Sequence, residues 1–111
     1  MEAQKIDLPA KVADTIIQAI RDYPEIEKVC VFGSRALGNA KPGSDIDLAV
    51  IGARVTPKTI SKLRDFLEEE TSIPYFFDVI AFNTIENEAL RDHILRYGKV
   101  LYQSTDSVAR P

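Results

Sequence analysis

The fold is decided by two segments, Phe32-Gly33-Ser34-Arg35-Ala36 and Ser44-Asp45-Ile46-Asp47-Leu48-Ala49-Val50. The apolar run at 46–51 predicts a strand, and Asp45 and Asp47 lie two residues apart where it begins. Because successive side chains of a strand point to opposite faces, these two carboxylates share one face of the predicted sheet. The apolar residues that alternate with them then point to the other face, into a core.

Two like charges side by side on a sheet repel each other, and placing them against an apolar core without a partner is costly. A divalent cation removes this cost. Magnesium prefers carboxylate oxygen and usually keeps waters and substrate phosphates as its other ligands. Asp45 and Asp47 therefore indicate a magnesium site.

A second strand is predicted at 28–33, and it ends at Gly33 and Ser34. If it pairs antiparallel with the strand at 46–51, its end lies beside Asp45, at the same edge of the sheet. Gly33 lets the backbone approach a ligand closely. Ser34 offers a hydroxyl and an N–H to phosphate oxygens, and Arg35 offers a charge-assisted contact.

Asp78 interrupts a third apolar strand predicted at 75–82. The connection between the strands at 46–51 and 75–82 is long enough for a helical crossover, which predicts that they run parallel. Asp78 would then lie beside Asp45 and Asp47. Three carboxylates next to a phosphate-binding turn indicate a phosphoryl-transfer site with two metal ions, roughly 3.5–4 Å apart.

The remaining elements follow from apolar periodicity and from capping signals. The helix at 84–97 is expected to begin with a capping box made by Asn83 and Glu86 and to bury Tyr97. The expected fold class is α/β (α+β), with a small mixed sheet of three to four strands flanked by helices. The predicted helices and the predicted edge strand span residues 9–23, 57–70, 84–97 and 99–102.

Composition predicts a single domain over residues 1–103 and a polar, flexible tail over 104–111. No segment is apolar and long enough to span a bilayer, and the polar N-terminus predicts a cytoplasmic protein. A net charge of −3 with no basic stripe weighs against a nucleic-acid partner. Cys30 is expected to be a small buried hydrophobe. His93 is expected to be a surface or partly buried residue rather than a ligand.

The spacing of Gly33-Ser34 and Asp45-Ile46-Asp47 resembles the motif of the polymerase-β-like nucleotidyltransferase superfamily. The local sequence most resembles that of the minimal nucleotidyltransferases of this superfamily, the MNT domains. The similarity lies in residues 32–36 and 44–50 and in the final segment, residues 97–102. This resemblance covers nearly the whole chain. It implies the nucleotidyltransferase fold.

The resemblance also implies roles for single residues. Asp45, Asp47 and Asp78 would be the catalytic, metal-binding carboxylates, with Asp78 often serving as base in such proteins. Gly33 and Ser34 would bind nucleotide phosphate. The resemblance assigns the same role to Arg35 less strongly. The implied reaction moves a nucleoside monophosphate, AMP from ATP, to a hydroxyl with the help of Mg²⁺. Relatives of this type pair with a small helical HEPN protein and act as the antitoxin of a toxin–antitoxin pair, so a HEPN partner and a homo- or hetero-oligomer are expected.

Two other functions remain open at this point. The chain could be a non-catalytic binding module that neutralises a partner by occlusion, although such a module has no need of three clustered carboxylates. It could also be a small-molecule (antibiotic) nucleotidyltransferase that acts as a homodimer.

Overall fold

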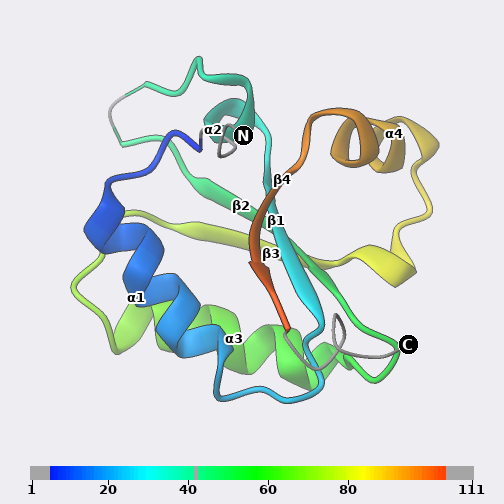
Figure 1. The fold of residues 1–111 in the computed structure, drawn as a ribbon, viewed down its shortest axis with the longest axis horizontal. Helices are drawn as coiled ribbons and strands as arrows, with labels where there is room; N and C mark the ends of the chain where they lie inside the picture. The colour runs from blue at the N-terminus through cyan, green and yellow to red at the C-terminus, as the bar shows by residue number, and fades with distance from the viewer. Residues whose placement is uncertain (1–5, 42, 105–111) are drawn as a thin grey trace.

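A computed structural model describes residues 6–41 and 43–104. It shows a mixed four-stranded sheet with α1 and α3 on one face and α4 on the other (Figure 1). Within the described residues no helix is both long and apolar enough to cross a membrane. In chain order the elements are α1 (Ala10–Ile20), β1 (Lys28–Phe32), α2 (Ser34–Leu37), β2 (Ile46–Ile51), α3 (Pro57–Glu69), β3 (Phe77–Ala81), the 3₁₀ turn η1 (Phe82–Thr84), α4 (Glu88–Tyr97) and β4 (Lys99–Gln103).

The strands lie in the order β3-β2-β1-β4. β1 pairs antiparallel with β2 and with β4, whereas β2 and β3 run parallel with α3 as their crossover. The predicted antiparallel and parallel pairings are both confirmed, as is the edge position of the last strand. The parallel pairing is the one that brings the third strand to the carboxylates of the second.

The two faces of the sheet are covered to different extents. On one face, the residues of the strands that point inward pack with Ile16 and Ile20 of α1 and with Leu63 and Leu67 of α3, and these helical residues are fully buried. On the other face, a smaller cluster places Ile94 of α4 against residues of β1 and β2. The larger cluster stabilises the domain, and the other face keeps room for polar groups.

The crossover helix α3 begins as its sequence predicts. The Thr56 side chain accepts a hydrogen bond from the N–H of Thr59, the Thr59 side chain accepts one from the N–H of Thr56, and Pro57 occupies the first turn. At the other end of α3 the Glu68 carboxylate accepts from the N–H of Phe77 at 2.8 Å. Both ends of the crossover are thereby tied, and the second tie holds the start of β3.

Three details of the predicted elements are wrong. The helix predicted at 84–97 begins only at Glu88, where the Asn87 side chain accepts from the N–H of Leu90. Asn83 forms no capping box and instead donates to the carbonyl of Gly52, because η1 turns the chain before α4 begins. Tyr97, expected to be buried, is 48% exposed.

Most of the predicted C-terminal tail cannot be compared with the structure. Ser104, placed in the predicted tail, still donates its N–H to the carbonyl of Glu27 at 2.8 Å. The rest of the predicted tail, residues 105–111, lies outside the described residues. Cys30 is buried in β1, as expected, and burial raises the pKa of its thiol.

Candidate functional site

Asp47 and Asp78 lie side by side on adjacent parallel strands. Asp47 of β2 is the register partner of Asp78 of β3. Because neighbours in register point to the same face of a sheet, the two carboxylates share the face opposite to α1 and α3. Asp45 immediately precedes β2 and is exposed. Asp78 therefore lies beside Asp47, one of the two carboxylates that it was predicted to meet.

The pKa of Asp47 responds to the charges of both other aspartates. The pKa of Asp47 is raised from 3.8 to about 6, first by burial, then by the negative charge of Asp78, then by that of Asp45. The positive charge of Arg35 opposes this rise. Asp47 is thus a partly buried carboxylate with two like charges beside it, an environment that favours binding of a proton or a cation.

Gly33 makes room for the Asp47 carboxylate. Phe32 and Asp47 are register partners in β1 and β2, so the next residue of the turn passes over Asp47. A Cβ atom on Gly33 would overlap Oδ2 of Asp47. Gly33 also has φ 74° and ψ −150°, which residues with a side chain rarely adopt. The glycine expected from the sequence is thus required by its conformation, and a side chain there would also displace the neighbouring carboxylate.

Ser34 begins α2, directly after this glycine. Its carbonyl accepts from the N–H groups of Gly38 and Asn39, which closes the short helix. Neither the hydroxyl nor the N–H of Ser34 has an acceptor within the described part of the chain. Ser34 therefore retains two donors next to the carboxylates, which is what a phosphate-binding residue needs.

Arg35 lies in the interior, where its guanidinium is bound by groups of the protein itself. Its side chain is only 5% exposed. Nη2 and Nε donate to the carbonyl of Ser44 at 2.8 and 3.2 Å, and Nη1 donates to the carbonyl of Asp7 at 2.8 Å. The guanidinium also lies 4.6 Å from the ring centre of Tyr75. Arg35 thus ties the backbone of Ser44 to that of Asp7, and the structure offers no support for a phosphate contact by this side chain.

One contact of the site had no signal in the sequence. His93 of α4 is partly buried, and its Nε2 accepts a hydrogen bond from the N–H of Gly33 at 3.0 Å. The two residues are 60 positions apart. Only the packing of α4 on the carboxylate face brings them together, and helical periodicity alone does not predict that packing.

The carboxylates fit a cation as a half-open site rather than a closed cage. In residues 6–41 and 43–104, no three His, Cys, Asp or Glu side chains converge closely enough to hold an ion by themselves. Magnesium does not require such a cage, because it commonly binds one or two carboxylates together with waters and substrate phosphates. The paired Asp47 and Asp78 meet that requirement, and the raised pKa of Asp47 is the mark of an uncompensated charge.

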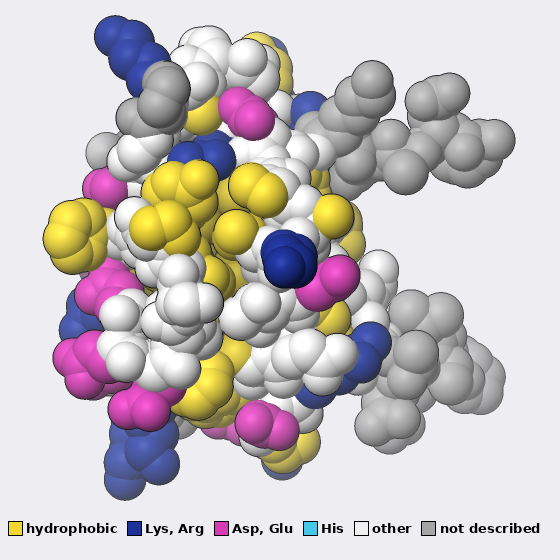
Figure 2. Space-filling model, turned by 90° about the vertical axis from the view of Figure 1, so that its left-hand side faces the viewer, with side chains coloured by type: hydrophobic (Ala, Val, Ile, Leu, Met, Phe, Trp, Pro, Cys, Tyr) yellow, Lys and Arg dark blue, Asp and Glu magenta, His cyan; other side chains and the backbone are white. Residues whose placement is uncertain are grey.

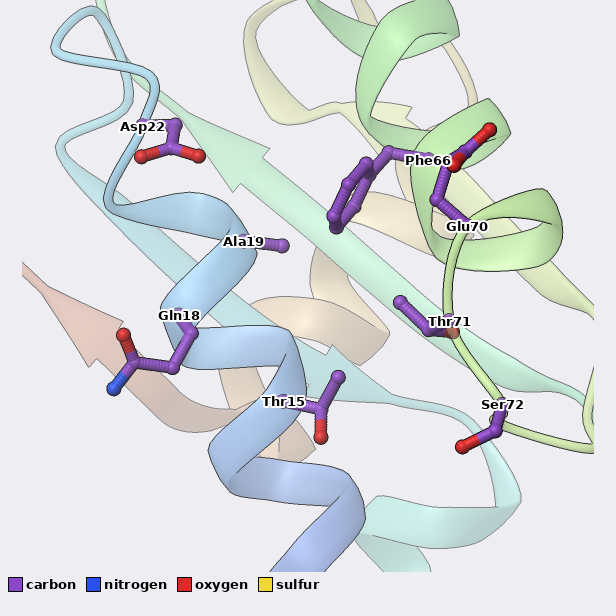
Figure 3. A pocket seen from close by; sticks show the side chains of 8 residues that line it. All are labelled: Thr15, Gln18, Ala19, Asp22, Phe66, Glu70, Thr71 and Ser72. Atoms are coloured by element: carbon purple, nitrogen blue, oxygen red, sulfur yellow. The ribbon is translucent and has the colours of Figure 1, made fainter.

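A groove elsewhere on the molecule lacks comparable chemistry. It has a volume of about 560 Å³ and runs between α1 and the end of α3. Figure 3 shows Phe66 reaching across it from α3 toward α1, while Gln18 points away. The groove lies on the opposite face of the sheet from Asp47 and has no paired carboxylates or phosphate-binding turn, so the carboxylate face is the better candidate site.

The fold and the carboxylate face together define a small α/β domain with the architecture of a nucleotidyltransferase. Residues 14–107 match the family described as "Polymerase beta, Nucleotidyltransferase", and the chain belongs to this family. No curated protein sequence matches the chain.

Solved structures with the same fold include MNT antitoxins in complex with HEPN toxins. A toxin–antitoxin crystal structure with AMP-PNP gives a TM-score of 0.70 at 24% identity, covering 86% of this chain and 76% of that chain. The toxin–antitoxin structure MntA–HepT gives a TM-score of 0.67 at 21% identity, covering 89% of this chain and 76% of that chain. A tri-AMPylated Shewanella oneidensis HEPN toxin in complex with MNT antitoxin gives a TM-score of 0.65 at 21% identity, covering 88% of this chain and 75% of that chain. At these identities the likeness is one of fold.

The first prediction concerns the charge of Asp47. Its pKa in the folded state, about 6, lies above its ordinary value of 3.8. The charge therefore destabilises the folded state fully above pH 6, and this cost disappears as the pH falls through 3.8. With metal chelated at pH 7.5, Asp47→Asn should raise the free energy of unfolding by on the order of 2 kcal/mol, and the gain should be absent near pH 3.5. Urea titrations across this pH range measure it. Asp14→Asn on the exposed side of α1 is the control, and a destabilised Asp47→Asn at pH 7.5 would contradict the assignment.

The second prediction concerns Arg35. Arg35→Lys keeps the charge but loses the planar group that donates twice to Ser44 and stacks on Tyr75. The free energy of unfolding should fall by about 1–3 kcal/mol, and limited proteolysis in the 38–45 loop should accelerate. The exposed Arg54 provides the control, because Arg54→Lys should change stability by less than about 0.5 kcal/mol. Equal effects of the two substitutions would argue against the structural role of Arg35.

Proposed function

We propose that this protein is a Mg²⁺-dependent nucleotidyltransferase that moves AMP from ATP to a hydroxyl group of a HEPN-type partner protein, as the antitoxin of a toxin–antitoxin pair. The observation that carries the proposal is the register pairing of Asp47 with Asp78 beside the Gly33–Ser34 turn, in a chain of the nucleotidyltransferase family. The paired charges would hold the metal-bound triphosphate.

Each residue has a defined task in the proposed reaction. Asp45, Asp47 and Asp78 would bind Mg²⁺, in a site for two ions, which would neutralise charge on the phosphates and polarise the α-phosphate. Ser34 would donate its free hydroxyl and N–H to phosphate oxygens. The acceptor oxygen would form a bond to the α-phosphorus, and its proton would pass to the exposed Asp78. The bond between the α-phosphorus and the bridging oxygen would break, and pyrophosphate would leave with its electrons.

The partner is proposed from the structural neighbours and from the exposed apolar residues. One neighbour contains a tri-AMPylated HEPN toxin with its MNT antitoxin, and another is the pair MntA–HepT. By analogy with these pairs, we expect the acceptor hydroxyl to lie on a HEPN-type protein that forms a hetero-oligomer with this chain.

Phe76 is the aromatic residue best placed to anchor such a partner. It is 73% exposed, and its carbonyl accepts from the N–H of Ile46, so it continues the ladder that leads into β3. Phe77 is buried in the main core, so strand alternation places Phe76 and Asp78 together on the other face. Apolar side chains gather on the side of the molecule where α1 and β3 begin (Figure 2). Exposed aromatic groups of this kind commonly dominate protein–protein binding.

The reaction is tested by intact-mass measurement of a candidate HEPN partner after incubation with the protein and Mg-ATP. We expect mass gains of one or more AMP units with the wild-type chain, and a loss of activity of at least about a hundredfold with Asp45→Asn, Asp47→Asn or Asp78→Asn. The control Asp65→Asn changes an exposed carboxylate of α3, on the other face, and should leave the transfer unchanged. Transfer that survives Asp47→Asn would refute the proposal, and partner binding without any transfer would favour the non-catalytic alternative.

The anchor is tested by Phe76→Ser. Loss of an exposed aromatic anchor should weaken binding to the HEPN partner by about thirtyfold, which corresponds to about 2 kcal/mol. Binding of Mg-ATP to the free protein should change much less, because the groups proposed to hold the phosphates are Ser34 and the carboxylates. Phe66→Ser is the matched control, since Phe66 is a partly exposed phenylalanine of α3 on the opposite face of the sheet. Calorimetry measures both affinities, and an equal loss for the two variants would contradict the placement of the partner.

A further inference from the structure

We infer that His93 is a positioning residue for the nucleotide-binding turn, which it holds in place through the N–H of Gly33. The inference rests on the proposed nucleotidyl transfer and assigns to this histidine a role in it. The hydrogen bond from Gly33 N–H to His93 Nε2 is 3.0 Å long and connects α4 to the turn between β1 and α2.

The geometry defines the state of the imidazole ring. Because Nε2 accepts the N–H of Gly33, it presents a lone pair to the turn, and the ring proton is on Nδ1. The ring lies edge-on to Phe32, at 6.2 Å between centres and 77° between planes, and 5.5 Å from the ring of Tyr97. Two aromatic neighbours thus fix the direction in which Nε2 points.

The hydrogen bonds of Gly33 explain why this contact matters. The carbonyl of Gly33 accepts from the N–H groups of Ala36 and Leu37, which are both local to the turn. His93 is the partner that ties the same residue to a distant part of the fold. Gly33 has a conformation open to few other residues and passes directly over Asp47. A small rotation of its peptide would move the turn relative to that carboxylate.

Two consequences follow for the site. The N–H of Gly33 is directed at α4 and is not available to a nucleotide, so the donors for phosphate come from Ser34, whose N–H and hydroxyl lack acceptors within the described residues. The Nε2 atom of His93 is likewise occupied and does not face a reacting group as a proton acceptor. His93 therefore acts through Gly33 and does not touch the substrate.

The test compares two replacements of the histidine. His93→Phe keeps a ring against Phe32 and Tyr97 but removes the acceptor, whereas His93→Gln can place an oxygen near the position of Nε2. In the nucleotide-free protein, the Gly33 amide of His93→Phe should exchange with deuterium about tenfold faster or more, and its NMR resonance should shift. His93→Gln should restore most of the protection.

Nucleotide binding supplies the second readout. The dissociation constant for Mg-ATP should rise about tenfold in His93→Phe and by much less in His93→Gln, while urea unfolding of both variants stays cooperative. If His93→Phe does not fold, His93→Asn, whose oxygen is too short to reach, replaces it as the variant that lacks an acceptor. Unchanged Gly33 protection in the variant without an acceptor, or equal losses in that variant and in His93→Gln, would overturn the inference. Failure of the wild-type chain to bind Mg-ATP would instead overturn the proposed function, because amide exchange is measured without nucleotide.

Discussion

The contact between Gly33 and the Asp47 carboxylate is the constraint on which the site depends. The end of β1 and the start of β2 are paired in register, so the turn after β1 passes directly over Asp47. A side chain at this position would displace Oδ2 from where it lies. The same carboxylate lies beside Asp78 through the parallel pairing of β2 and β3. One antiparallel strand pair and one parallel strand pair thus converge on the carboxylate of Asp47. Both pairings are needed to place it between the Gly33 turn and Asp78.

The division of the sheet into two faces explains how a small domain holds an unfavourable cluster of charge. The large apolar cluster with α1 and α3 lies wholly on one face, with many fully buried side chains. This face carries the stability of the fold, because burial of apolar surface is the dominant favourable term. On the other face, α4 buries Ile94 against only part of the sheet. On the same face Asp47 stays half-buried and Asp78 exposed.

Much of this arrangement is predictable from local patterns. The two-residue alternation around Asp45 and Asp47 identifies β2, and the length of the following connection predicts the parallel partner that carries Asp78. Thr56 and Pro57 mark the start of α3 because capping is a local interaction. Predictions failed where the deciding contact is distant. Asn83 has the right spacing for a capping box but donates to Gly52 instead. His93 is partly buried as predicted, but no local pattern predicts its contact with Gly33, because that contact depends on how α4 packs.

Arg35 illustrates the same limit in a charged residue. A cation beside a glycine–serine turn suggests a phosphate ligand when only the sequence is considered. In the folded chain, two carbonyls and an aromatic ring surround its guanidinium, and it still lowers the pKa of Asp47 from that buried position. The positive charge of Arg35 thus affects the site although the side chain is buried. Its compensation is incomplete, since burial and the two neighbouring acids still raise the pKa of Asp47 to about 6. A surface that only had to bind a partner would be more stable with an amide at that position, so the retained carboxylate favours a cation-binding function over simple occlusion.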